Sequence, residues 1–98
     1  MIIRLVKMTF QVENIEAFQD HFQQHQEKIR QFAGCNHLEL WQDARDERIF
    51  FTYSQWEGKE FLEAYRRSDL FQGVWASTKQ WFVERPEAWT VQSKAVLS

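Results

Sequence analysis

His21 and His25 are the residues whose spacing most resembles a metal site. Histidines four positions apart on a helix can turn both rings toward one point, as they do in zinc-binding helices. Phe22 stands where such a helix carries its glutamate, and a third ligand would have to come from His37 or Glu39. The sequence therefore favours a helix-face histidine pair, and it predicts no metal.

Cys35 is the only cysteine, so the chain cannot form an internal disulfide. In an extended strand His37, two residues along, points the same way and is a candidate base for a thiolate nucleophile. No Asn or Asp that would orient this base is identifiable. The pattern favours a buried structural thiol, because free cysteine commonly behaves as a small hydrophobic residue.

The charged clusters Lys59-Glu60 and Arg66-Arg67 have two interpretations. In the simpler one they are solvated helix faces, and in the other an arginine close to a cavity mouth holds an acidic substrate. The chain has no phosphate-binding loop, no dinucleotide fingerprint and no spaced carboxylate pair. We therefore expect no cofactor.

Hydrophobic periodicity indicates the elements that must position these residues. Residues 2–12 alternate as a strand, and Asn14 is a candidate N-cap for an amphipathic helix that runs to a C-cap at Gly34. Alternation returns in 35–42 and 49–56, with a polar turn between them, which predicts a hairpin. The apolar stripe of the helix consists of Ile15, Phe18, Phe22, His25, Ile29 and Phe32.

The second half of the chain repeats this order. A short helical pattern over 61–65 is interrupted near Ser68, which can cap a further helix that extends through Phe82 and ends at Arg85-Pro86. Residues 88–96 read as a last strand with a frayed tail. The order βαββαβ over one domain, residues 1–98, predicts an α+β ferredoxin-like sandwich, a four-stranded antiparallel sheet with its helices on one face.

Such a sheet leaves its other face bare. Ile3 and Leu5 would put apolar area there, together with either the Ile49/Phe51/Tyr53 set or the Phe50/Trp56 set. Covering about 600 to 800 Å² per chain with a second copy gives a gross driving force on the order of 15 to 20 kcal/mol before association costs. We therefore expect a homodimer closed sheet to sheet.

Composition excludes several other classes of protein. With 44% hydrophobic and 27% charged residues the chain of 98 residues should fold as one domain, and a net charge of -2 argues against a nucleic-acid partner. No apolar stretch is long enough to span a bilayer, so we expect no membrane partner and a cytoplasmic location. Aromatic residues make up 16% of the chain, and that surplus favours a dimer interface, a ligand cavity or both.

The most informative stretch is Phe51-Thr52-Tyr53-Ser54-Gln55-Trp56-Glu57, followed by Ala64-Tyr65 and Ser68-Asp69-Leu70-Phe71. A strand that ends in Trp, then a short helix, then an S-D-L-F break, resembles the antibiotic biosynthesis monooxygenase family of small dimeric α/β-barrel proteins. The Gly34-Cys35 start of the second strand fits the same pattern, so the likeness covers nearly the whole chain. The family includes quinone-forming oxygenases, haem-degrading enzymes, signal-processing proteins and members without an assigned activity.

The resemblance can be carried over only position by position. In the cofactor-free members that oxidise phenols, an Asn lies four residues before the strand-end Trp and a Tyr six after it. Trp56 matches that Trp, whereas Thr52 and Leu62 stand at the other two positions. In the haem-degrading members an Asn, a Trp and a His fall at positions that here are Val6, Tyr65 and Trp75. Without that His there is no axial iron ligand, which argues against haem breakdown.

Cofactor-free oxygenation is the chemistry that the resemblance leaves open. The protein desolvates an electron-rich anion such as a phenolate, which then gives an electron to oxygen. This requires an apolar pocket, a hydrogen-bond donor and a base, and His25 can supply the base only if its ring turns inward. The candidate catalytic residues are Trp56, Thr52 and His25, and the candidate substrate-binding residues are Ser54, Tyr65, Trp75 and Phe71.

Three interpretations of the chain remain open at this point. It is a cofactor-independent monooxygenase of a small aromatic or other oxidisable metabolite, a non-catalytic module that binds an apolar small molecule, or a dimeric module whose aromatic residues simply fill its core. The absence of a pocket larger than a water molecule beside Trp56 would select the third interpretation, whereas oxygen uptake with phenols and ligand binding without turnover separate the first two.

Overall fold

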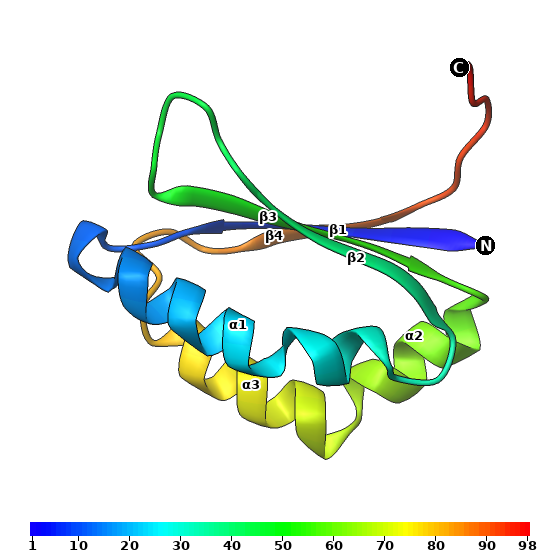
Figure 1. Ribbon diagram of the computed structural model, residues 1–98, viewed down its shortest axis with the longest axis horizontal. Helices are drawn as coiled ribbons and strands as arrows, with labels where there is room; N and C mark the ends of the chain where they lie inside the picture. The colour runs from blue at the N-terminus through cyan, green and yellow to red at the C-terminus, as the bar shows by residue number, and fades with distance from the viewer.

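Four antiparallel strands form one sheet in the order β2-β3-β1-β4 in a computed structural model that describes residues 1–98. All three helices cover the same face of this sheet (Figure 1). The predicted α+β ferredoxin-like fold is confirmed, with its second helix divided in two. The elements are β1 (Ile2–Thr9), a 3₁₀ turn (Val12–Asn14), α1 (Ile15–Arg30), β2 (Cys35–Gln42), β3 (Ile49–Trp56), α2 (Lys59–Arg66), α3 (Asp69–Lys79) and β4 (Glu87–Val91).

The main core lies between α1 and the two central strands. Met8 of β1 pairs with Phe50 of β3, and both side chains point to the helices, where they are 3% and 1% exposed. Phe10 and Phe18 stack there with ring centroids 4.1 Å apart. Burying a side chain of this size contributes about 1.5 to 3 kcal/mol, so this cluster fixes α1 on the sheet.

A second, smaller cluster attaches α2 at the other end of the sheet. Ile2, Cys35, Trp56 and Leu62 are buried together there. The helix layer is thus fastened to the sheet at two places, and a cavity remains between them.

Two predicted helix N-caps behave differently. Ser68 caps α3 as expected, because its Oγ accepts a hydrogen bond from the Phe71 amide at 3.1 Å and also donates to the Tyr65 carbonyl at 2.6 Å. Asn14 stands at the N-cap position of α1, but its side chain makes no capping hydrogen bond. The preceding 3₁₀ turn leads into α1 instead.

The helix expected to run through Phe82 ends earlier, at Lys79. Phe82 pairs with Phe10 in an isolated bridge, and the amide of Val83 donates to the Thr9 carbonyl at 2.9 Å. These backbone hydrogen bonds hold the segment after α3 against the end of β1, so the segment is extended there although its sequence pattern is helical.

Gly34 is not the C-cap of α1, which ends at Arg30. It lies in the turn that enters β2, closed by a hydrogen bond from the Cys35 amide to the Phe32 carbonyl at 3.0 Å. Its φ of +86° is one that glycine tolerates, and a Cβ placed here would lie 2.4 Å from the Phe61 side chain. The glycine therefore serves the turn and lets α2 approach.

The face of the sheet opposite the helices carries an apolar patch, with the ion pairs Lys7–Glu87 and His37–Glu39 beside it. Tyr53, Leu5 and Trp89 form one row across β3, β1 and β4, and the ring of Trp41 stacks on Tyr53 with centroids 5.0 Å apart. Of the two sets left open above, Ile49/Phe51/Tyr53 lies on this side, because Phe50 is buried under the helices. We call the residues Ile3, Leu5, Trp41, Phe51, Tyr53, Trp89 and Val91 the outer face.

None of the helices combines the length and apolar character that crossing a membrane requires.

Candidate functional site

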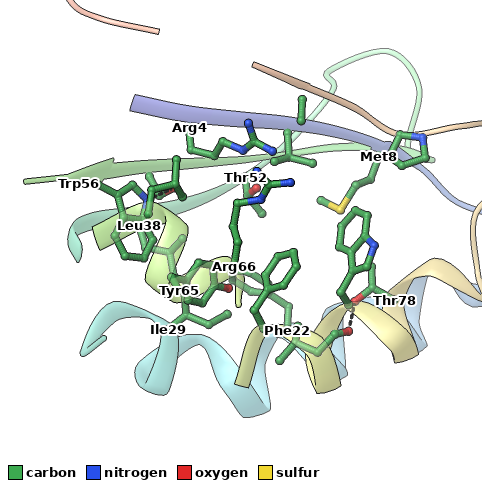
Figure 2. A pocket seen from close by; sticks show the side chains of 18 of the residues that line it. Arg4, Met8, Phe22, Ile29, Leu38, Thr52, Trp56, Tyr65, Arg66 and Thr78 are labelled. Atoms are coloured by element: carbon green, nitrogen blue, oxygen red, sulfur yellow. Dashed lines mark hydrogen bonds between the residues drawn. The ribbon is translucent and has the colours of Figure 1, made fainter. Parts of the chain in front are cut away.

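A cavity of about 300 Å³ lies between the sheet and the helices, bordered by members of both core clusters (Figure 2). Its volume is at the lower end of the range for small-molecule sites, and most of its lining is apolar. The interpretation in which side chains fill this space completely is thus disfavoured. Six predicted site residues line the cavity: Thr52, Ser54, Trp56, Tyr65, Phe71 and Trp75.

Alternation along β3 brings Thr52, Ser54 and Trp56 to the cavity. The Trp56 indole is 1% exposed, and its Nε1–H donates to Ser54 Oγ at 2.9 Å. Tyr65 stacks on it with ring centroids 5.0 Å apart. Since the indole is buried and its polar atom is already bonded, Trp56 supports the Tyr65 ring at the border of the cavity. Thr52 offers a hydroxyl that makes no hydrogen bond within the chain.

Tyr65 reaches the cavity from α2. Burial raises the pKa of its phenol well above the ordinary value, and the nearby Cys35 thiol adds to this shift. The hydroxyl therefore keeps its proton at neutral pH. It has no hydrogen-bond partner within the chain and is not sealed off in the interior, so it can donate to a ligand in the cavity.

The aromatic wall contributed by α3 consists of Phe71 and Trp75, whose rings stack with centroids 5.8 Å apart. One turn further on, the Thr78 hydroxyl donates to the Val74 carbonyl at 2.8 Å. Thr78 is thus already satisfied, and α3 presents mainly apolar surface to the cavity.

His25 does not line the cavity. Its Nδ1 lies 2.8 Å from the carbonyl oxygen of His21, one turn earlier on α1, to which it donates as N–H. The two imidazole centroids are 4.6 Å apart, and His21 in turn reaches the Val74 carbonyl on α3 at 3.2 Å. Helical phase puts His25 on the apolar stripe, but this local bond holds its ring along the helix and away from the cavity.

The metal ligands considered above do not assemble. His37 and Glu39 lie on β2 and bond to each other on the side opposite the helices, so neither joins the histidines of α1. No three His, Cys, Asp or Glu side chains are grouped as metal ligands.

Cys35 is 5% exposed and belongs to the smaller core cluster. Burial raises the pKa of its thiol, against smaller opposing effects from its hydrogen bond to the His37 carbonyl and from Arg30. A thiol with a raised pKa is a poor nucleophile at neutral pH, which supports the structural interpretation.

Arg4 and Arg66 both line the cavity, a pairing that the sequence did not predict. Arg4 lies on β1 between Ile2 and Val6, on the face that alternation turns to the helices. Desolvation lowers its pKa, and the charge of Arg66 lowers it further, so the two guanidinium groups lie close enough to affect each other. For Arg66 the cavity-mouth interpretation is the one that the geometry favours.

The positions singled out by family resemblance also border this space. Leu62, where the phenol-oxidising relatives carry a Tyr, is 5% exposed and contributes a buried apolar wall. Val6 lines the cavity from the sheet. The side chains that differ from the family pattern are thus part of the same cavity lining, and their replacement makes it more apolar.

Comparison with known proteins identifies one family. A family model described as antibiotic biosynthesis monooxygenase matches residues 1–76. No curated protein is significantly similar to the chain in sequence.

Solved structures share the whole fold. A candidate antibiotic biosynthesis monooxygenase from Nitrosomonas europaea superposes with a TM-score of 0.89 at 16% identity, covering 97% of this chain and 100% of that one. A conserved protein from Methanosarcina mazei Go1 gives 0.89 at 20% identity, over 96% and 94% of the two chains. A further candidate monooxygenase, from Deinococcus radiodurans, gives 0.89 at 12% identity, over 100% and 97%. At these identities the likeness establishes the fold alone.

Proposed function

Because the chain belongs to the antibiotic biosynthesis monooxygenase family, we propose that it is a cofactor-independent monooxygenase that oxidises a small aromatic substrate inside the cavity. The observation that carries this proposal is the aromatic enclosure itself. Trp56, Tyr65 and Trp75 come from three different elements and border one space of about 300 Å³. Thr52 and Tyr65 supply hydroxyls there.

In this reaction the substrate supplies the electrons. A bound phenolate transfers one electron to dioxygen, giving an aryloxyl radical and superoxide. These combine at a ring carbon that carries hydrogen to form a peroxide anion, which takes a proton from water and becomes a hydroperoxide. Loss of water from the hydroperoxide leaves a quinone, so one phenol and one O2 give one quinone and one H2O. The protein excludes bulk water, places the ring against Phe71 and Trp75, and donates a hydrogen bond to the phenolate oxygen from Thr52.

The lining contains no side chain that can act as a base near neutral pH. Its ionisable groups are Tyr65, whose pKa is raised by burial, and the permanently charged Arg4 and Arg66. The substrate therefore binds as its anion or loses its proton to water at the cavity mouth. The rate of the reaction therefore follows the fraction of the phenol that is ionised, so it should rise with pH and be higher for more acidic phenols.

Oxygen uptake by the purified protein with phenols and hydroquinones tests this function. Thr52→Val keeps the shape of the side chain and removes its hydrogen bond to a charged intermediate, so the rate should fall roughly 10- to 100-fold. Trp41→Phe changes an aromatic residue of the outer face and is the matched control for Trp56→Phe. Equal rates in the wild type, Thr52→Val and Trp56→Phe would remove these residues from the mechanism.

A non-catalytic binding module is the second candidate, and a specific feature favours it. Thr52 and Leu62 replace the polar pair of the phenol-oxidising relatives, and no base lines the cavity. In this case an aromatic ligand raises the melting temperature of the protein, while oxygen uptake stays at the rate of the uncatalysed reaction.

The outer face supports a homodimer. Tyr53, Leu5 and Trp89 expose a continuous apolar row, and Trp89 is 42% exposed in the single chain. Packing this face on a second copy buries it and leaves the cavity, on the other side of the sheet, free to bind substrate. Light scattering should report about twice the chain mass of 11.9 kDa.

A further inference from the structure

Arg4 and Arg66 place two positive charges at one cavity. Arg4 lies on β1, and Arg66 is the last residue of α2. Figure 2 shows the two guanidinium groups reaching toward the same part of the space, one from the sheet and one from the helices, next to Thr52. The cations therefore converge although they come from opposite layers of the fold.

Neither guanidinium has a carboxylate partner. The ion pairs of the chain are Lys7 with Glu87, His37 with Glu39, and Arg48 with Asp46. Arg4 uses one nitrogen to donate to the Thr90 hydroxyl at 2.9 Å, and the Arg66 side chain makes no hydrogen bond.

No Asp or Glu lines the cavity. Two neighbouring cations repel each other, and an anion bound between them would remove that repulsion while using their free donors. The electrostatics of the site thus favour a negatively charged ligand.

The rest of the lining indicates the chemistry of the uncharged part of the ligand. Phe22, Leu38 and Trp75 border the cavity with apolar surface, together with Trp56. A small inorganic anion would leave this surface uncovered, whereas a neutral aromatic molecule would leave the guanidinium groups unpaired. A ring that carries one acidic group satisfies both parts of the cavity.

We propose that Arg4 and Arg66 form a carboxylate clamp, and that the ligand of the cavity is an aromatic acid whose ring lies against Phe71 and Trp75. The inference rests on the proposed function in that this acid is the substrate to be oxidised. A carboxylate suits two planar guanidinium forks because each can donate two parallel hydrogen bonds to it. The reacting phenolate is not the clamped group, since pairing it with two cations would withdraw the electron density that it must give to oxygen.

The clamp is tested by binding without turnover. Calorimetric titration under argon compares 2,5-dihydroxybenzoate with its methyl ester, which keeps both ring hydroxyls and loses only the negative charge. The wild type should bind the acid at least tenfold more tightly than the ester. Arg4→Gln and Arg66→Gln should each weaken the binding of the acid about tenfold and leave binding of the ester within about twofold.

Arg67→Gln is the matched control, because it removes the same charge one residue further along and Arg67 does not line this cavity. It should keep the preference of the wild type for the acid. Equal affinity of the wild type for acid and ester, no binding of the acid at millimolar concentration, or an unchanged preference in both Arg4→Gln and Arg66→Gln would overturn the clamp.

Admitting air to the same samples separates the clamp from the proposed function. Preferential binding of the acid without oxygen uptake would retain the clamp and refute the oxygenase. Equal affinity for acid and ester, with oxygen uptake from both, would retain the oxygenase and refute the clamp. Uptake that is faster with the acid, and lowered by Arg66→Gln but not by Arg67→Gln, supports both.

Discussion

Replacing Ser54 with Ala tests how the Trp56 indole is held. The indole is 1% exposed and Ser54 is 7% exposed, so the substitution leaves a buried N–H without its acceptor at 2.9 Å. Leaving such a donor unpaired costs about 1 to 3 kcal/mol of the free energy of unfolding. We expect the lower part of that range, because Ser54 borders the cavity and a water molecule can enter the space of the lost hydroxyl.

A double-mutant cycle isolates this bond from other effects of the substitution. Trp56→Phe removes the donor, so Ser54→Ala should cost less in that background, with a coupling energy of about 1 kcal/mol. Urea unfolding followed by circular dichroism, at one fixed protein concentration, measures all four proteins. Ser77→Ala, at a serine that makes no side-chain hydrogen bond, should change stability by less than about 0.5 kcal/mol. A coupling energy within about 0.3 kcal/mol of zero would refute the arrangement of the indole described above.

Three further predictions address the reaction, the turn and the assembly. Because Tyr65 keeps its proton and no lining group acts as a base, the rate of oxygen uptake should rise with pH as the substrate ionises. Two phenols of different pKa should therefore give pH profiles with different midpoints. A midpoint shared by both phenols would reveal a base on the protein. Gly34→Ala should destabilise the chain by at least about 1 to 3 kcal/mol because of the φ of +86° and the overlap of its Cβ with Phe61. Gly73→Ala, in α3 with open space around it, should stabilise the chain by about 0.5 to 1 kcal/mol. A denaturation midpoint that rises in Gly34→Ala, or falls in Gly73→Ala, would contradict the corresponding assignment. Leu5→Lys should place a charge in the outer face and give an 11.9 kDa monomer by light scattering. Gln92→Lys, beyond the end of β4, should leave the dimer intact. A Leu5→Lys protein that is still a dimer would exclude the outer face as the interface.

The regular elements could be predicted because local patterns and tertiary packing agree in them. The alternation of 49–56 gives the extent of β3 and groups Thr52 with Trp56 on one face, but it does not say which face the helices cover. Ser68 caps α3 as its residue type indicates. The end of α3 could not be predicted, since it depends on backbone bonds to the distant residue Thr9. Helix ends set by nonlocal pairing leave no signal in the local sequence.

The candidate site was predictable only in its aromatic part. The walls around Trp56 follow from family resemblance and strand alternation, whereas His25 depends on a ring orientation that helical phase does not determine. Arg4 carried a signal, because alternation places it with Val6 and Met8 on the inner side of β1. A charge at such a position is usually a solvated strand end, and only the three-dimensional arrangement brings it together with Arg66.

Filling the cavity tests most directly whether oxidation occurs there. Ala88 lines it from β4, next to Val6 in the sheet, so Ala88→Phe places a ring in the space for the substrate. Oxygen uptake with 2,5-dihydroxybenzoate should be measurable in the wild type and should fall at least about tenfold in Ala88→Phe, with unchanged helix content. Ala95→Phe, in the tail beyond β4, is the control and should keep the rate of the wild type. Uptake by Ala88→Phe at the rate of the wild type would place the reaction elsewhere and contradict the account.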